Sequence, residues 1–78
     1  MNVLILATEN CNHRPLVEKQ LKKMNISYEV QYVDKQPELI RRFSIFSSPN
    51  IIVNGEIAFR ANEERSLPTK ADLEAMFS

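Results

Sequence analysis

The chain has 78 residues, and its 10 Lys and Arg residues balance its 10 Asp and Glu residues, so its formal net charge is zero. This length fits one small domain over residues 1–78, and the scattered, balanced charge argues against nucleic acid or an anionic membrane surface as an electrostatic partner. The single cysteine excludes an internal disulfide and an all-cysteine metal site within one chain, which indicates a reducing compartment.

The first predicted element is a strand over residues 2–7, because this segment is short and continuously apolar. A run of about five apolar residues without a preceding basic stretch is too short for a signal sequence or a membrane span. We therefore expect a cytoplasmic protein that has no membrane partner.

A helix is predicted over residues 12–24, with Pro15 in its first turn, where the missing N–H of proline costs little. Asn25 is expected to end this helix, and Glu18 and Lys22 are expected to pair with each other on its solvent side. The apolar residues that recur with helical spacing, and so define its expected core face, are Leu16, Val17, Leu21 and Met24.

A second strand is predicted over residues 27–33, where apolar and mostly polar residues alternate. A second helix follows, with Pro37 near its start and the segment 47–49 as its breaker. Its expected core stripe consists of Leu39, Ile40 and Phe43, with Phe46 as a candidate fourth member.

Two short strands are predicted over residues 50–53 and 56–60, joined by Asn54-Gly55, a strong signal for a type I′ hairpin turn. Thr69 and Asp72 then form a capping box that opens a last helix, docked by Leu73, Met76 and Phe77. The resulting order is β-α-β-α-β-β-α, with a right-handed parallel first unit. We expect the first and last helices to share one face of the sheet and the middle helix to cover the other.

Cys11 lies in the polar segment 8–14, between the first strand and the first helix. At such a turn the free N–H groups and the dipole of the helix N-terminus favour a thiolate over a thiol. Arg14, and His13 while it is protonated, add positive charge, whereas a single histidine without a partner ligand predicts no metal site. The alternatives are an inert, packed cysteine and two solvated cations. The candidate catalytic residues are therefore Cys11, His13 and Arg14.

The element order, the cysteine at the first strand–helix turn and the proline that opens the third strand resemble the thioredoxin-like fold, closest to the small thioredoxin- and glutaredoxin-like proteins of prokaryotes. Residues 47–56 resemble the family's segment of small residue, cis-proline, strand and turn, and residues 67–73 resemble its entry to the last helix. The resemblance implies a three-layer α/β fold, a four-stranded mixed sheet with helices on both faces. It also implies a cis Ser48–Pro49 bond and a substrate-binding groove at Asn12, Ser48 and Pro49.

The family's Cys-x-x-Cys motif reads Cys11-Asn12-His13-Arg14 in this chain, so the nucleophilic cysteine is present and Arg14 occupies the resolving position. A dithiol enzyme uses its second thiol to release the mixed disulfide, so this chain would need an outside thiol. Glutathione is then a candidate co-substrate, and no bound cofactor is implied. The Gly-Gly-Asp-like segment that glutaredoxins use on glutathione is replaced by residues 60–65.

Three functional hypotheses follow. The first is a monothiol thiol–disulfide oxidoreductase in cell redox homeostasis, with Cys11 as the nucleophile and protein or small-molecule thiols and disulfides as partners. The second is a redox-inactive module that keeps the fold and its groove and binds a protein or a peptide. The third is a thiol reductase that binds an oxyanion such as arsenate at the helix N-terminus.

Overall fold

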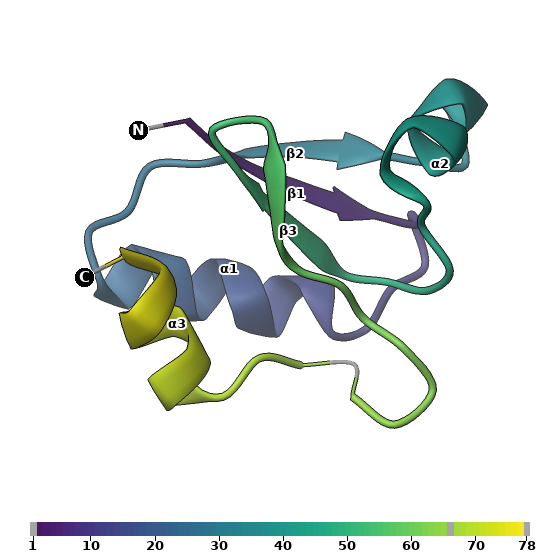
Figure 1. Ribbon diagram of the computed structural model, residues 1–78. Helices are drawn as coiled ribbons and strands as arrows, with labels where there is room; N and C mark the ends of the chain where they lie inside the picture. The colour runs from purple at the N-terminus through teal and green to yellow at the C-terminus, as the bar shows by residue number, and fades with distance from the viewer. Residues whose placement is uncertain (1, 66, 78) are drawn as a thin grey trace.

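The structure is a computed structural model that describes residues 2–65 and 67–77. Its elements follow the predicted order (Figure 1). They are β1 (Val3–Ala7), α1 (Arg14–Lys23), β2 (Glu29–Tyr32), α2 (Pro37–Phe43), β3 (Asn50–Val53), β4 (Glu56–Phe59) and α3 (Lys70–Phe77).

The four strands form one mixed sheet in the order β2-β1-β3-β4. The pair β1–β2 is parallel, whereas β3 runs antiparallel to both β1 and β4. The predicted hairpin turn is confirmed, because Asn54 and Gly55 both have positive φ angles, 52° and 84°. The parallel first pair and the antiparallel last pair are therefore as predicted.

Helices α1 and α3 cover one face of the sheet and α2 covers the other (Figure 1). Successive side chains of β1 point to opposite faces, so Ile5 packs in one core cluster and Leu6 in the other. The first cluster comprises Val3, Ile5, Ala7, Val17, Leu21, Ile51, Phe59, Ala61 and Leu73. The second comprises Leu6, Val33, Leu39, Ile45 and Ile52.

Two helices end in the same left-handed motif. Asn25 ends α1 with a φ angle of 58°, and the N–H of Ile26 donates to the Leu21 carbonyl at 3.0 Å. Ser44 ends α2 with a φ angle of 53°, and the N–H of Ile45 donates to the Ile40 carbonyl at 3.0 Å. This Schellman geometry satisfies carbonyl groups that the end of a helix would otherwise leave unpaired.

The core of α2 differs from the predicted stripe. Phe46 is 80% exposed and Ile40 is 39% exposed, whereas Ile45, which the stripe omitted, is buried. The left-handed residue Ser44 ends the helical spacing before Phe46, so that Ile45 turns into the core instead. Phe46 lies three residues beyond the end of α2 at Phe43, so the predicted stripe runs past the helix.

The predicted core face of α1 is wrong at one position. Val17 and Leu21 are buried, and they lie one above the other at i and i+4 on the helix. Leu16 is 49% exposed, because a neighbour in sequence is turned by roughly 100° around a helix from the buried stripe.

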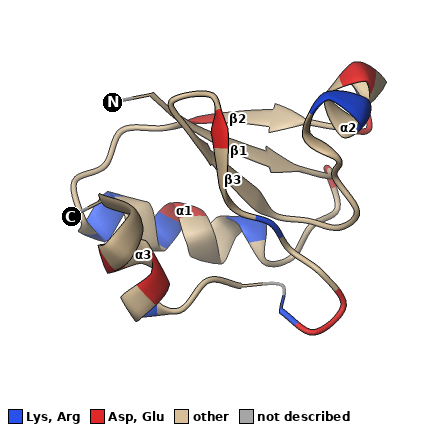
Figure 2. Cartoon of the chain, viewed as in Figure 1, with Lys and Arg blue, Asp and Glu red and all other residues tan. Residues whose placement is uncertain are grey.

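The last helix begins with the predicted capping box. The N–H of Asp72 donates to Thr69 Oγ1 at 3.0 Å, and the N–H of Thr69 donates to Asp72 Oδ2 at 2.9 Å. The second of these bonds, from the Thr69 backbone, is the main reason why the pKa of Asp72 is lowered. Both signs of charge occur on all three helices (Figure 2). Within residues 2–65 and 67–77, no helix is long and apolar enough to cross a membrane.

Candidate functional site

Cys11 sits in a tight turn at the end of β1, where its backbone N–H donates to the Thr8 carbonyl at 3.2 Å. Its side chain is half-buried and packs against the first core cluster. Helix α1 begins at Arg14, two residues later than predicted, with His13 as the cap residue. Pro15 favours this start, because proline suits the first positions of a helix. Cys11 therefore precedes the helix by a short bend.

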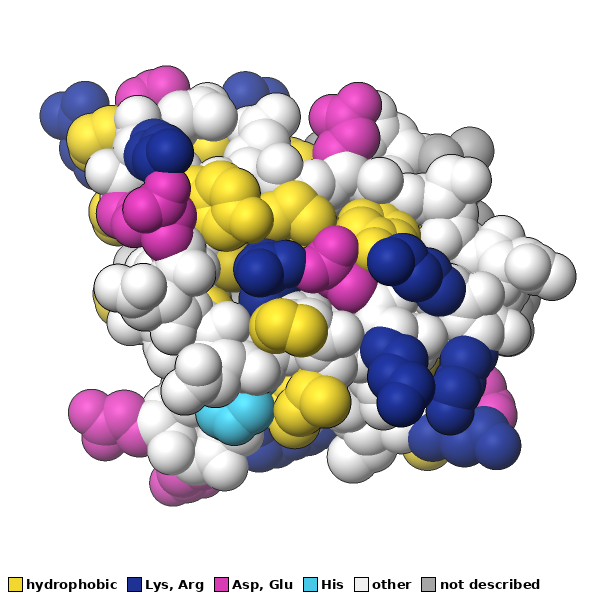
Figure 3. Space-filling view, turned by 180° about the vertical axis from the view of Figure 1, so that it is seen from behind, with side chains coloured by type: hydrophobic (Ala, Val, Ile, Leu, Met, Phe, Trp, Pro, Cys, Tyr) yellow, Lys and Arg dark blue, Asp and Glu magenta, His cyan; other side chains and the backbone are white. Residues whose placement is uncertain are grey.

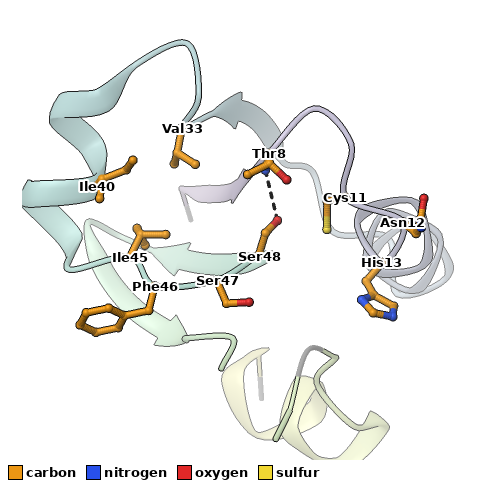
Figure 4. Close-up of a pocket in the computed structure, with 10 residues that line it drawn as sticks. All are labelled: Thr8, Cys11, Asn12, His13, Val33, Ile40, Ile45, Phe46, Ser47 and Ser48. Carbon is orange, nitrogen blue, oxygen red and sulfur yellow. Dashed lines mark hydrogen bonds between the residues drawn. The ribbon is translucent and has the colours of Figure 1, made fainter. Parts of the chain in front are cut away.

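An open groove of about 420 Å³ lies beside Cys11 (Figure 4). Cys11, Asn12 and His13 form one side of it, and Thr8 with two serines lies in the middle. Apolar side chains form the other side: Val33, Ile40, Ile45 and Phe46. The groove thus brings together the cysteine, the histidine and the segment before Pro49, which the sequence had indicated as one site.

The serine segment is attached directly to the cysteine turn. The N–H of Thr8 donates to Ser48 Oγ at 3.2 Å, as the dashed line in Figure 4 shows. The Ser48–Pro49 peptide bond is cis. The ring of Pro49 is fully buried, so Ser47 and Ser48, and not Pro49, line the groove.

Asn50 is a structural residue of the site that the sequence analysis missed. It is fully buried, and its Nδ2 group donates to the carbonyls of Ser47 at 2.7 Å and Leu6 at 3.2 Å. Its Oδ1 atom accepts the N–H of Ala61 at 3.0 Å. The available signal was a polar residue at the start of a buried strand, where a buried amide must find hydrogen-bond partners.

The cysteine turn is also attached to the segment that follows β2. The N–H of Glu9 donates to Asp34 Oδ2 at 3.4 Å, and Lys35 Nζ lies 2.6 Å from Glu9 Oε1. The hydrogen bond to Glu9 raises the pKa of Lys35. These charged groups do not line the groove, and the positive charge of Lys35 is paired with the carboxylate of Glu9 outside it.

Arg14 does not line the groove. Its guanidinium forms an ion pair with Glu18 and lies 5.7 Å from the centre of the Tyr32 ring. Glu18 also accepts the hydroxyl of Tyr28 at 2.9 Å, so the predicted Glu18–Lys22 pair is replaced by this cluster. Burial, followed by the hydrogen bond to Glu18, raises the pKa of Tyr28.

His13 and Asn12 occupy the helix side of the groove. The His13 side chain makes no capping hydrogen bond, and its half-buried ring lies on the same side as Cys11 (Figure 4). The carbonyl of His13 accepts the N–H groups of Leu16 and Val17, so the backbone of this residue is fixed by the first turn of α1. Among the described residues, no three His, Cys, Asp or Glu side chains are grouped so that they could hold a metal ion.

Comparison with known proteins gives one consistent result. The family model described as "Thioredoxin domain" matches residues 1–77. The SPbeta prophage-derived thioredoxin-like protein YosR of Bacillus subtilis (strain 168) is 31% identical over 71 residues, which cover 81% of this chain and 89% of that protein. The crystal structure of a mutant of the thioredoxin-like protein BC3987 superposes with a TM-score of 0.74 at 20% identity. The superposition covers 99% of this chain and 100% of the BC3987 chain.

Proposed function

The chain belongs to the thioredoxin domain family, and on this premise we propose that it exchanges thiols and disulfides through Cys11 as a monothiol. The observation that carries the proposal is the position of Cys11, half-buried on a groove that is also lined by the two serines that precede Pro49. A family fold alone does not establish an activity, so the proposed activity rests on the geometry of this site.

The proposed reaction has two displacement steps. The Cys11 thiolate attacks one sulfur of a disulfide, a bond forms between the two sulfurs, and the other sulfur leaves as a thiolate that takes up a proton. Since the chain has no second cysteine, an external thiol such as glutathione then attacks the mixed disulfide and releases Cys11. The sum exchanges one half of the substrate disulfide for the external thiol, and atoms and electrons balance.

We assign proton transfer in this exchange to His13. Its ring lies on the groove beside Cys11 and makes no capping hydrogen bond, and an imidazole is the most common general acid and base in catalysis. Arg14 is left out of the reaction, because its charge is paired with Glu18 and it does not line the groove.

The test is mass spectrometry of the folded protein after incubation with hydroxyethyl disulfide. We expect one adduct on the wild type and on Arg14→Ala, none on Cys11→Ser, and loss of the adduct when glutathione is added. An unmodified wild type, under conditions in which the unfolded chain is modified, would show that Cys11 is a packed residue without exchange activity.

The rival hypothesis, a redox-inactive binding module, predicts a different pattern. Such a module would bind its partner equally well after Cys11→Ser, and the wild type would form no adduct. The two readings are thus separated by the same pair of proteins.

A further inference from the structure

We infer that a depression between β4 and α3 is a second binding site, which takes a small, singly charged organic carboxylate with an apolar body. The depression has a volume of about 430 Å³ and shares no lining residue with the groove beside Cys11. Its walls are residues 58–60, residues 62 and 65 of the loop that follows β4, and three residues of α3 (Figure 1). The inference therefore does not depend on the reaction of Cys11.

The apolar part of the depression continues the core of the protein to the surface. Phe59 is a member of the first core cluster, and Met76 packs against that cluster. Ala58 on β4 and Ala75 on α3 are exposed, and their small side chains leave room between the strand and the helix. An apolar ligand body in this position would cover apolar surface and gain hydrophobic free energy.

Arg65 is fixed at the depression by both its side chain and its backbone. Its guanidinium forms an ion pair with Asp72 and lies 5.7 Å from the centre of the Phe59 ring. Its N–H donates to Asn62 Oδ1 at 2.9 Å, and its carbonyl accepts the N–H of Asn62 at 2.8 Å. Because the loop already holds this guanidinium in place, a ligand has little ordering cost to overcome.

Arg60 supplies the charge that has no partner within the protein. Its Nη2 group donates at 3.2 Å to the carbonyl of Phe43, the last residue of α2. A guanidinium has five N–H donors, so this bond orients the group and leaves others for an anion. Within residues 2–65 and 67–77, no carboxylate forms an ion pair with Arg60.

The charges of the lining favour a ligand with one negative charge. Two arginines and one aspartate line the depression, so its net charge is +1. A carboxylate accepts two parallel N–H bonds from a guanidinium and balances this charge. A phosphate monoester carries nearly two negative charges near neutral pH, and Asp72 would repel the excess. Glu63 and Glu64 are exposed and do not line the depression.

Basic side chains beside apolar ones do not by themselves make a site. Lys and Arg side chains also lie next to apolar ones on the face that Figure 3 shows, opposite that of Figure 1. The depression adds two features: it is hollow, and both of its arginines are held by other groups of the protein. A ligand therefore meets fixed donors above an apolar floor.

The test is an NMR titration of the isotope-labelled protein near neutral pH with three compounds of matched size: phenylacetate, its neutral amide phenylacetamide, and phenyl phosphate. We expect phenylacetate to give saturable shifts of the backbone signals of residues 58–65. Phenylacetamide should bind on the order of tenfold more weakly, because it lacks the charge that strengthens the hydrogen bonds. Phenyl phosphate should bind more weakly than phenylacetate.

Arg60→Gln should weaken phenylacetate binding on the order of tenfold and leave phenylacetamide binding unchanged. Arg41→Gln is the matched control, because Arg41 is exposed and does not line the depression, and it should change neither affinity. Cys11→Ser should bind phenylacetate as the wild type does. Thermal unfolding of the three variants checks that each retains the fold.

Equal affinities for phenylacetate and phenylacetamide, or for wild type and Arg60→Gln, would overturn the inference. Absence of saturable shifts at residues 58–65 would do so as well. Tighter binding of phenyl phosphate would contradict the assignment to a carboxylate. None of these results bears on the proposed exchange at Cys11, which is measured separately through its adduct with hydroxyethyl disulfide.

Discussion

The side-chain Oδ1 of Asn50 accepts the backbone N–H of Ala61 at 3.0 Å, in the interior of the protein. The same side chain donates to the carbonyls of Ser47 and Leu6. One amide thus joins the end of β1, the segment before Pro49 and the residues after β4. Thr8, which follows β1, and Ser47 and Ser48, which precede Pro49, line the groove, so the shape of the site depends on a residue that does not line it.

Asn50→Ala should lower the free energy of unfolding by about 3 kcal/mol, because it leaves buried backbone groups without partners. Urea denaturation measures this value. Asn12→Ala is the control, because Asn12 is exposed, and it should change stability by less than about 0.5 kcal/mol. Similar stability in the two variants would mean that water or a backbone shift replaces the bonds of Asn50.

Tyr28→Phe should cost about 1 kcal/mol near neutral pH, because it removes the hydrogen bond from Tyr28 to Glu18. The pKa of Tyr28 is raised by folding, so the native state holds the phenolic proton more tightly than the unfolded state. The stability from this source is complete below the unfolded pKa of tyrosine and is lost as the pH rises through the folded pKa.

Denaturation curves of the wild type and Tyr28→Phe at increasing alkaline pH test this sign. The advantage of the wild type should shrink as the pH rises. Tyr32→Phe serves as control, because it retains the Tyr28–Glu18 bond. An advantage that grows at alkaline pH would contradict the assignment.

Arg14→Cys should convert the monothiol into a dithiol protein. The substitution places a second sulfur in the first residue of α1, in the resolving position of the motif. We expect an intramolecular disulfide, seen as the loss of two hydrogen atoms by mass spectrometry, and a gain of insulin reduction with a dithiol reductant. Arg14→Ser is the control and should show neither. If Arg14→Cys still has two free thiols after treatment with an oxidant, the prediction is contradicted.

Thr69→Ala should lower the free energy of unfolding by about 1 kcal/mol, as expected for loss of a helix cap.

Asp72→Asn should destabilise the protein at neutral pH and have little effect in acid. Folding lowers the pKa of Asp72, so its contribution is present above the unfolded pKa and is lost as the pH falls through the folded pKa. Denaturation at neutral and at acid pH measures both effects. A pH-independent effect of Asp72→Asn would assign its role to shape and not to charge.

The order of the elements, the parallel pair β1–β2 and the hairpin β3–β4 were predicted from patterns along the chain, whereas the antiparallel pair β1–β3 was not. The strand at residues 2–7 is apolar apart from its first residue. Asn54-Gly55 specifies the turn between β3 and β4, and Thr69 with Asp72 specifies the start of the last helix. These three signals agree with the tertiary structure, and such agreement between local pattern and fold is the usual property of a foldable sequence.

The predictions failed where the position of a side chain depends on partners from other segments or on the local backbone conformation. Glu18 was expected to bind Lys22 but binds Arg14 and Tyr28, since Tyr28 arrives from the next strand. Phe46 was a candidate member of the core stripe, but α2 ends at the left-handed residue Ser44 and Phe46 is exposed. The role of Asn50 was missed because its partners come from residues 6, 47 and 61. Pattern reading along the chain cannot supply such pairings.

The place of β1 in the sheet also bears on how the chain folds. This strand lies between a parallel neighbour, β2, and an antiparallel neighbour, β3, in which Val3 is paired with Val53. The partner strand β3 is synthesised some fifty residues after β1, so the pairing of these two strands closes a long loop and carries an entropy cost. We expect β1, α1 and β2 to associate first, and the hairpin of β3 and β4 to form on its own and then dock. The groove beside Cys11, which needs both halves, would be the last part of the molecule to assemble.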